Sequence, residues 1–523
     1  MLTAQLPAPL RVLLSAAIGA ATVALTCAST VLPARADNAV SPVDSKFTIV
    51  GAGWGHGRGM SQYGAYGAAS KGLDYAAIVG FYYPGTTLAK LDEGNTVRVW
   101  ITADNDQRLH FRPSSGLVVS DAAGTTVTLP TGSKYTKWRI SKSAGVRVLR
   151  YRNPSGTYVK FTTKLDGGSA WYVANPKTGR VLLSLPSGAT KAYRGRLGLA
   201  FTSSGARTVN YLPMEDYLRS VVPAEMPASW SAEALKAQAV AARTYAARLR
   251  SVAATGSGYD LCDTSACQVY KGVSWEVGTT DRAIAATADR VLLYQGKPAM
   301  TEFSSSNGGW SAAGGADRPY LTAQQDPYDG VKRNQAWQVS LTSAKLAKLY
   351  PGVGTPTSLK VDTRDGNGTY GGRVETIRIS GTRGSVTVTG SAFKSKLGLK
   401  ERLFTVVGGS VTNLTTTLSA NTTRWQELGG ETGSLGAPTA AETDVAGGSR
   451  LAFAQADLWW STGTGSHVLT GAVRAAYNAL GGPGSQLGFP KTDVVTADGG
   501  TYADFRLGRI TCPASGDCVI SFG

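Results

Sequence analysis

The sequence contains few histidines, and its acidic residues are outnumbered by basic ones. Its 523 residues include three histidines, His56, His110 and His467, which lie too far apart for the paired spacing of a zinc protease. We find no nucleotide-binding loop string and no GxSxG elbow for a serine nucleophile. Asp and Glu number 35 against 53 Lys and Arg, which gives a formal net charge of +18. The pattern therefore disfavours chemistry based on a histidine-bound metal, a nucleotide or a catalytic triad, and leaves carboxylates as candidate catalytic groups.

Long apolar runs are also lacking after residue 36. Arg11 is followed by an apolar, small-residue stretch at residues 12–28 and then by an A-x-A pattern at 34–36, which predicts a secretory signal peptide over residues 1–36. An uncleaved anchor is the alternative, but the apolar run is short for a bilayer span. Cys27 matches a lipoprotein box poorly because Thr26 precedes it. We therefore predict a secreted protein that has no lipid and no membrane attachment after cleavage.

The basic excess remains after the predicted cleavage, because only Arg11 and Arg35 are lost and the charge becomes +16. A strongly basic exported protein suits anionic polymers, which in a bacterial wall are peptidoglycan and teichoic or related acids. The sequence has neither a nucleic-acid motif nor a dense run of Lys and Arg, so we do not expect nucleic acid as a partner. We expect an anionic polymer as the partner.

Strand patterns dominate residues 45–407, with a few helical segments between them. Residues 96–210 are β-rich, and we expect helices near 60–70, 280–289 and 342–349. Further strands are expected at 374–379, 385–388 and 397–400. The fold class we predict is α+β, with mixed, largely antiparallel sheets.

The C-terminal part contains an internal repeat. Residues 428–438 match residues 480–490, a period of 52, and Phe453 and Phe505 are separated by the same period. Self-similarity at a fixed period indicates copies of one small unit. Residues 408–423 are rich in Thr, Ser and Asn and are the expected linker, which makes 424–523 a repeat domain.

One carboxylate, Glu225, stands between Pro223 and Pro227 just ahead of an alanine-rich segment at 231–254. That segment contains no Gly or Pro and predicts a helix with Ser231 as its N-cap. The prolines bias the residues before them away from helical angles. These features suggest a site, although an ordinary acid before a surface helix is an equal alternative.

The strings at 215–218, 222–227 and 234–245 resemble the SpoIID/LytB family, as does the block GWGHGRGMSQYGA at 53–65. The resemblance covers about residues 48–407, and the family includes peptidoglycan lytic transglycosylases and amidase enhancers. The glycine-rich block, within segment 45–90, stands first here but near the C-terminus in the family, so we expect a circular permutation. The C-terminal strings resemble LGFP repeats, which implies wall binding, with a plain structural domain as the alternative.

The resemblance implies that Glu225 is the catalytic acid of a lytic transglycosylase. Such an enzyme needs one carboxylate, because the muramic acid C6 hydroxyl closes a 1,6-anhydro ring and no water is used. Glu215 is the rival carboxylate, although acids in such a helix often serve caps or ion pairs. The alternative function is noncatalytic binding that stimulates a separate amidase, and a purely structural wall protein is a third possibility.

A wider set of polar residues is expected to bind the glycan, partly by resemblance and partly by helical spacing. Lys236 and Arg243 are seven residues apart on one helix face, with solvation as the alternative role. The loop around His56 is more consistent with a groove or a structural hydrogen bond than with a metal. The expected substrate-binding residues are Arg243, Gln238, Lys236, Tyr270, Gln268, Ser304, Ser306, His56 and Gln62.

Two close cysteine pairs, Cys262 with Cys267 and Cys512 with Cys518, predict disulfides in an exported protein. Zinc is the alternative for the first pair, because some relatives of the family bind zinc near this point. No histidine lies between residues 211 and 319, so zinc would need a distant ligand. We expect no metal and no cofactor.

Overall fold

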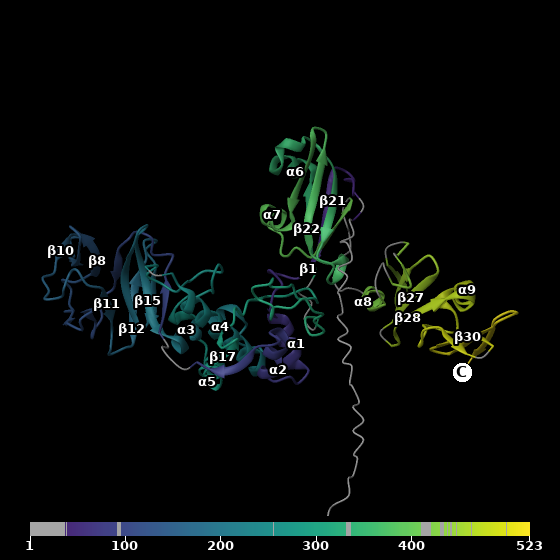
Figure 1. Ribbon diagram of the computed structural model, residues 1–523, viewed down its shortest axis with the longest axis horizontal. Coiled ribbons are helices and arrows are strands. Elements are labelled where there is room, and N and C mark those ends of the chain that lie inside the picture. The colour runs from purple at the N-terminus through teal and green to yellow at the C-terminus, as the bar shows by residue number, and fades with distance from the viewer. Residues whose placement is uncertain are drawn as a thin grey trace, which may run out of the picture. The chain divides into compact units, whose positions relative to one another are not determined.

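The computed structural model describes residues 37, 39–91, 96–254, 256–330, 336–408 and 420–522, apart from 429–432, 437, 440, 441, 446, 462 and 498. The expected signal peptide and residues 409–419 of the expected linker lie outside the described residues. The described chain is α+β, with largely antiparallel sheets, as the sequence predicts (Figure 1). Within this part of the chain, no helix is both long enough and apolar enough to cross a membrane.

Two sheets form the β-rich part and share one hydrophobic core. The six-stranded sheet has the order β10-β9-β8-β5-β12-β13 and the seven-stranded sheet has the order β16-β4-β15-β14-β11-β6-β7. The first consists of β5 (Leu109–Phe111), β8 (Lys137–Ser143), β9 (Val146–Arg152), β10 (Tyr158–Lys160), β12 (Arg180–Ser184) and β13 (Thr190–Arg194). The second consists of β4 (Thr96–Trp100), β6 (Val118–Asp121), β7 (Thr126–Thr128), β11 (Trp171–Ala174), β14 (Arg196–Thr202), β15 (Gly205–Pro213) and β16 (Leu261–Cys262).

Helix α4 (Ala232–Val252) is the centre of the helical part. Ser231 caps it by accepting a hydrogen bond from the Ala234 N–H, as the sequence predicts. Its buried alanines let neighbouring helices approach closely, and it contacts the four other helices of this part. These are α1 (Gln62–Ser70), α2 (Tyr75–Tyr82), α3 (Met214–Glu225) and α5 (Gly278–Ala286). Short strands lie beside them: β2 (Met60–Ser61), β3 (Thr87–Lys90), β17 (Arg290–Tyr294), β18 (Lys297–Pro298) and β19 (Phe303–Ser304).

A second core is built around the first strand of the chain. β1 (Lys46–Ala52) is the middle strand between β20 (Ala336–Thr342) and β24 (Phe404–Gly408), antiparallel to both (Figure 1). Phe47 pairs with Gly408, so the start of β1 lies beside the end of β24. The other elements here are β21 (Pro356–Arg364), β22 (Val374–Gly381), β23 (Gly384–Thr389), α6 (Ser343–Leu349) and α7 (Gly390–Leu397).

The expected strand at 397–400 is wrong. Leu397 ends α7, and Gly398 adopts the left-handed conformation that closes the helix. The short run of alternating leucines resembles a strand, but Phe393 and Leu397 are the buried face of a helix.

The C-terminal module consists of two similar four-stranded sheets, each with one helix. The bridges Pro438–Phe453 and Pro490–Phe505 occupy equivalent places and are 52 residues apart, which is the sequence period. α8 starts at Ala420, so residues 420–423 of the expected linker are helical. Asn421 is buried, and Trp425 packs on the core of the module. The elements are α8 (Ala420–Glu427), β25 (Thr443–Val445), β26 (Gly448–Ala452), β27 (Ala456–Ser461), β28 (Gly465–Thr470), α9 (Gly471–Ala479), β29 (Val495–Ala497), β30 (Gly500–Phe505), β31 (Gly508–Pro513) and β32 (Val519–Phe522).

Candidate active site around Glu225

Glu225 is the last residue of α3. Pro223 lies inside the helix, so the expectation that it would keep the preceding residue non-helical is wrong. Val221 and Val222 are completely buried, and this packing outweighs the local preference before a proline. The Met226 N–H closes the final turn onto the Val222 carbonyl at 2.9 Å. The helix therefore stops with the Glu225 side chain beside the loop that follows Cys267.

The Glu225 carboxyl is half-buried, and its burial raises its pKa above the ordinary value for a glutamic acid. Three groups oppose this effect: the Val269 N–H, which donates to Oε1 at 3.0 Å, a hydrogen bond to the Gln62 side chain, and the positive charge of Lys271. The balance leaves the pKa raised. A carboxyl that holds its proton closer to neutral pH is suited to general acid catalysis.

Two side-chain amides from distant segments lie beside this carboxyl. Gln62 begins α1 in the glycine-rich block, and its Nε2 donates to Oε1 of Gln238 on α4 at 3.4 Å. Gln238 is completely buried, and its own Nε2 has no hydrogen-bond partner among the described residues. Gln62, Glu225 and Gln238 therefore form one polar cluster, although the glycine-rich block stands at the opposite end of the sequence from its place in the resembling family.

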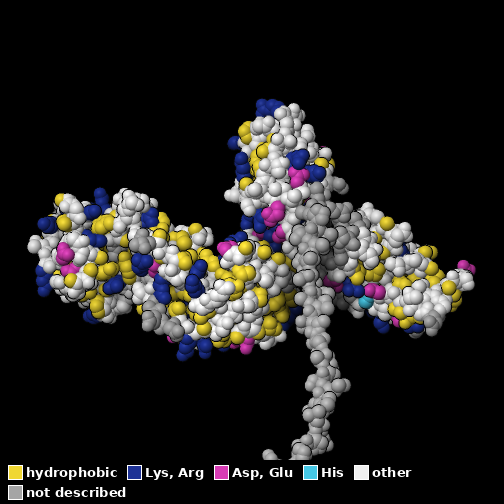
Figure 2. All heavy atoms as spheres, in the orientation of Figure 1, with side chains coloured by type: hydrophobic (Ala, Val, Ile, Leu, Met, Phe, Trp, Pro, Cys, Tyr) yellow, Lys and Arg dark blue, Asp and Glu magenta, His cyan; other side chains and the backbone are white. Residues whose placement is uncertain are grey.

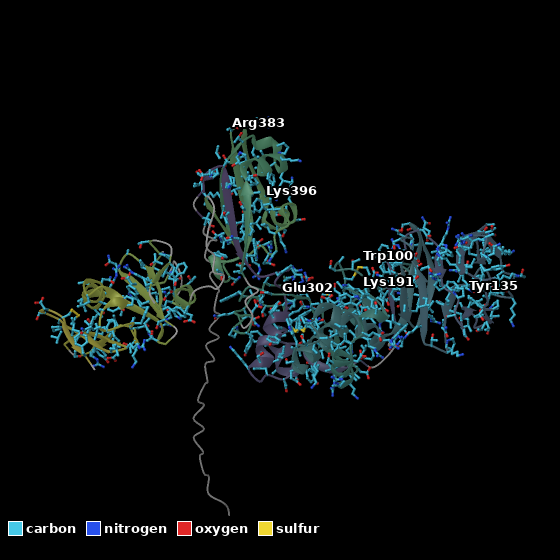
Figure 3. All side chains as sticks on the ribbon, turned by 180° about the vertical axis from the view of Figure 1, so that it is seen from behind. Trp100, Tyr135, Lys191, Glu302, Arg383 and Lys396 are labelled. Carbon is cyan, nitrogen blue, oxygen red and sulfur yellow. A yellow bond between two sulfur atoms is a disulfide. The ribbon has the colours of Figure 1, made fainter. Side chains whose placement is uncertain are left out.

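His56 lines a pocket whose lining does not include Glu225, Gln62 or Gln238. That pocket has a volume of about 440 Å³ and is lined by His56, Arg58, Ser391, Lys394, Ser395, Gly398, Leu399 and Arg402. Burial, together with the nearby charge of Arg58, lowers the pKa of His56 to about 4, so the ring is neutral at physiological pH and its Nδ1 accepts the Arg58 N–H at 3.1 Å. Arg58 in turn makes a bidentate pair with Glu302, at 2.8 and 2.7 Å (Figure 3).

Arg243 does not face a groove. Its side chain is completely buried and forms a bidentate pair with Glu215, at 2.8 and 2.7 Å. It also donates to the carbonyls of Ala239, Ile284 and Arg290. Arg243 therefore connects neighbouring helices and does not face a glycan. Glu215 is its ion-pair partner.

The expected ligands Gln268 and Tyr270 are buried behind the site. The Gln268 side chain accepts from the Tyr217 hydroxyl at 3.0 Å and donates to the Ala242 carbonyl, while the Tyr270 hydroxyl donates to Asn210 at 2.7 Å. Neither side chain is available to a polymer, so these two expectations are wrong.

The remaining expected ligands have mixed surroundings. Lys236 pairs with Glu233 at 2.7 Å and keeps a quarter of its side chain exposed. Ser306 is completely buried and donates to Asp329 at 2.7 Å, whereas the Ser304 hydroxyl is buried without a hydrogen-bond partner among the described residues. β19, which carries Ser304, pairs with β2 just before Gln62. The structure thus leaves Lys236 as the accessible member of this group.

Sequence reasoning missed the backbone of the loop that binds Glu225. The structure joins Cys262 to Cys267, and Val269 and Lys271 follow directly. A second disulfide joins Cys512 to Cys518 in the C-terminal module. A backbone N–H has no signature in the residue letters, although the string after Cys267 marks the loop that contains it.

Comparisons with known proteins find relatives for two parts of the chain. The SpoIID family model, described as Stage II sporulation protein, matches residues 202–294, and the LGFP repeat matches residues 435–485. The chain is similar to an amidase enhancer of Bacillus subtilis (strain 168), 42% identical over 133 residues, which are 25% of this chain and 17% of that protein. It is also similar to stage II sporulation protein D of the same organism, 29% identical over 274 residues, which are 48% of this chain and 76% of that protein.

A further relative is stage II sporulation protein D of Bacillus amyloliquefaciens, 30% identical over 223 residues, 38% of this chain and 61% of that protein. The chain thus spans about a sixth of the amidase enhancer and larger parts of the two sporulation proteins. The segment matched by the SpoIID family contains α3, α4 and Glu225. The segment around Glu225 is thus similar to the SpoIID family, and part of the C-terminal module is similar to the LGFP repeat.

Proposed function

We propose that the protein acts at the bacterial cell wall as a peptidoglycan lytic transglycosylase. It would cleave the bond between MurNAc and GlcNAc in glycan strands and leave 1,6-anhydro-MurNAc ends, while its LGFP repeat binds the wall. The observation that carries this proposal is the half-buried Glu225 carboxyl, whose pKa is raised although two hydrogen-bond donors hold it in place. Its position inside the SpoIID match supports the same conclusion.

One carboxyl is enough for this reaction. Protonated Glu225 gives its proton to the bridging oxygen as the bond from MurNAc C1 to that oxygen breaks. The resulting carboxylate takes the proton of the MurNAc C6 hydroxyl, whose oxygen bonds to C1 and closes the anhydro ring. The proton on Glu225 is thereby restored, and no water is consumed. Because nucleophile and electrophile belong to one sugar, the attack has a low entropic cost.

The surroundings of Glu225 fit both halves of this cycle. Burial favours the protonated acid before the first transfer, and the Val269 N–H, Gln62 and Lys271 stabilise the carboxylate after it. The groups that lower the pKa of this carboxyl against its burial are two hydrogen-bond donors and a cation.

A second candidate function is noncatalytic binding of peptidoglycan that stimulates a separate amidase. It is favoured by the 42% identity to a protein named amidase enhancer. In that case Glu225 would contact the glycan without transferring a proton to it.

Mass spectrometry of purified glycan strands, intact and peptide-stripped, separates the two functions. We expect anhydro-muramyl products from the protein and none from Glu225→Gln, because the amide keeps the shape but cannot donate the proton. Glu427→Gln is the matched control, since Glu427 is half exposed on α8 and pairs with Arg424. Binding without cleavage on both substrates would overturn the enzyme proposal and favour the enhancer.

A further inference from the structure

The positive charge of this protein is concentrated in its β-rich part. Residues 96–210 contain 18 Lys and Arg but only four Asp and Glu, a difference of 14 in a chain whose formal net charge is +18. Figure 2 shows Lys and Arg side chains spread over the visible surface of this part, with few acidic ones between them. An uneven charge of this kind indicates a binding partner with many negative charges.

Along the strands of the seven-stranded sheet, side chains that point to the core alternate with side chains that point to the opposite face. That opposite face carries cations and aromatic rings. Along β15, Thr208, Asn210 and Leu212 share one face, so Arg207, Val209 and Tyr211 share the other, on which Val209 is itself completely buried. The register places Tyr211 between Arg98 of β4 and Arg196 of β14.

The other side chains of this face follow from the same register. Trp100 is opposite Val209, and Tyr172 of β11 is opposite Gly198. We call Arg98, Trp100, Tyr172, Arg196, Arg207 and Tyr211 the cation–aromatic face.

The side chains of this face contact one another closely. The Arg196 guanidinium lies 4.1 Å from the centre of the Tyr172 ring and 5.7 Å from that of Tyr211. The two rings meet edge to face at 5.1 Å over Gly198, where a Cβ would come within 3.1 Å of Tyr211. The Arg207 guanidinium lies 4.3 Å from the centre of the Trp100 ring. Contact with an aromatic ring holds each guanidinium in place on this face.

The charges of Arg196 and Arg207 remain available. The recorded interactions of Arg196 are with rings, and those of Arg207 are with rings and the Ser204 hydroxyl. Arg98 differs, because Asp260 neutralises it at 2.6 Å. None of the six side chains of the face is buried, although the strands beneath them form part of the main core.

We propose that the cation–aromatic face binds the peptidoglycan glycan strand, with sugar rings against Trp100 and Tyr172 and lactyl carboxylates against Arg196 and Arg207. Charge complementarity supports an acidic glycan, and aromatic rings beside guanidiniums suit sugars that carry carboxylates. The choice of this polymer rests on the proposed function, and β15 leads directly into α3, which ends at Glu225. Nucleic acid and phosphodiester polymers share the charge but lack this carboxylate-bearing sugar repeat.

Binding is measured with the full mature chain carrying Glu225→Gln, so that the strands stay intact. The probe is peptide-stripped glycan strands, which keep the lactyl carboxylates. We expect Arg196→Gln with Arg207→Gln to weaken binding about tenfold or more, because two charge-assisted contacts are lost. Lys345→Gln with Lys348→Gln removes the same charge from exposed positions on α6 and should leave binding unchanged. Thermal unfolding of each variant shows that it is folded.

Three results would overturn the proposal. One is equal binding by the folded double arginine variant. Another is equal binding to neutral chitooligosaccharides, which lack the carboxylate. The third is tighter binding to poly(glycerol phosphate) or to single-stranded DNA than to glycan strands. Failure of the proposed function is distinguishable, because a chain that makes no anhydro products but binds glycan through Arg196 and Arg207 would still support this face.

Discussion

At the scale of single residues, the chemistry of Glu225 depends on a balance between burial and hydrogen bonding. Burial raises the pKa of the carboxyl, and the Val269 N–H and Gln62 moderate that rise. The acid must be protonated at the start of the proposed cycle, so activity should fall as pH rises through its pKa. The alkaline limb of the pH profile therefore reports the environment of this one group.

Gln62→Ala should move that limb to higher pH. The substitution removes a hydrogen bond that stabilises the carboxylate, and the pKa of Glu225 then rises further above its ordinary value. The measurement is the rate of anhydro-product formation between pH 4 and 9. Gln338→Ala, at an exposed position on β20, is the matched control. A lower rate with an unmoved limb would mean that Gln62 positions substrate and does not tune the acid.

Asp104 provides a second residue-scale prediction, now for stability. Burial raises its pKa to about 7, and Thr208 donates a hydrogen bond to it at 2.6 Å. The unfolded carboxyl titrates at about 4. The folded state therefore keeps a proton that the unfolded state has lost, and stability falls as pH rises from about 4 to about 7.

Asp104→Asn removes this dependence. The melting temperature of the variant relative to the parent should rise across pH 4 to 7 and stay level above it, as followed by differential scanning fluorimetry. Other titrating groups cancel in the difference. A difference that does not change with pH would contradict the raised pKa.

Sequence reasoning at this scale singled out Glu225, whose role as the acid stays a prediction, but misjudged the surroundings of several neighbouring residues. Glu225 was identifiable because a recognisable string surrounds it. Arg243 shares that string, but its letters do not reveal that the side chain is buried against Glu215. Tyr270 and Gln268 were misjudged for the same reason, since polar side chains can equally face a groove or satisfy one another in a core.

At the scale of elements, α3 and α4 are held together by a charged pair. Arg243 is completely buried while Glu215 is 30% exposed, so the arginine depends on this one carboxylate and three carbonyls. Leaving a buried charge without its partner is more costly than losing an exposed pair.

Glu215→Ala should lower the free energy of unfolding by about 3 kcal/mol, the low end for a buried pair because Glu215 is partly exposed. Chemical denaturation measures this change. Glu215→Leu with Arg243→Leu should cost less than Glu215→Ala, because no charge is then left unpaired. A larger loss in the double variant would show that the carbonyl contacts of Arg243 matter more than its pairing with Glu215.

Elements with a strong local pattern were predictable, and those defined by tertiary packing were not. The alanine-rich run and Ser231 gave α4 almost to its bounds, and α6 and β22 fall where expected. Residues 397–400 alternate like a strand, yet Gly398 closes α7 instead. Pro223 argued against a helix, yet α3 continues through it, because Val221 and Val222 just before it are buried.

At the scale of the whole molecule, the pairing of β1 bears on the expected permutation. The end of β24 at Gly408 lies opposite Phe47 at the start of β1, and the strands are antiparallel. A short turn could therefore join them directly, which is the order that the glycine-rich block has in the resembling family. The permutation itself stays a prediction from the sequence order.

A chain with its segments rearranged tests whether the fold tolerates the order found in the resembling family. Residues 96–408, a glycine-containing linker, residues 37–91 and then residues 409–523 should fold to the same sheets, and this order keeps the pairing of Asp37 with Arg364 and of Val40 with Leu359. We expect a free energy of unfolding within about 2 kcal/mol of the native order, because only loop-closure entropies change. Circular dichroism and chemical denaturation measure this. A rearranged chain without cooperative unfolding would show that the native connections are required.

β1 is the middle strand of its sheet, and it is synthesised long before the strands with which it pairs. This strand leaves the ribosome early, but its partners in β20 lie roughly 290 residues further along the chain. At about 5–20 residues per second, that delay is on the order of tens of seconds. Throughout it, a largely apolar strand has both hydrogen-bonding edges unsatisfied, a condition that invites pairing with other chains. β1 must therefore remain unpaired until nearly the whole domain has been made. This makes the segment one to which a chaperone is expected to bind.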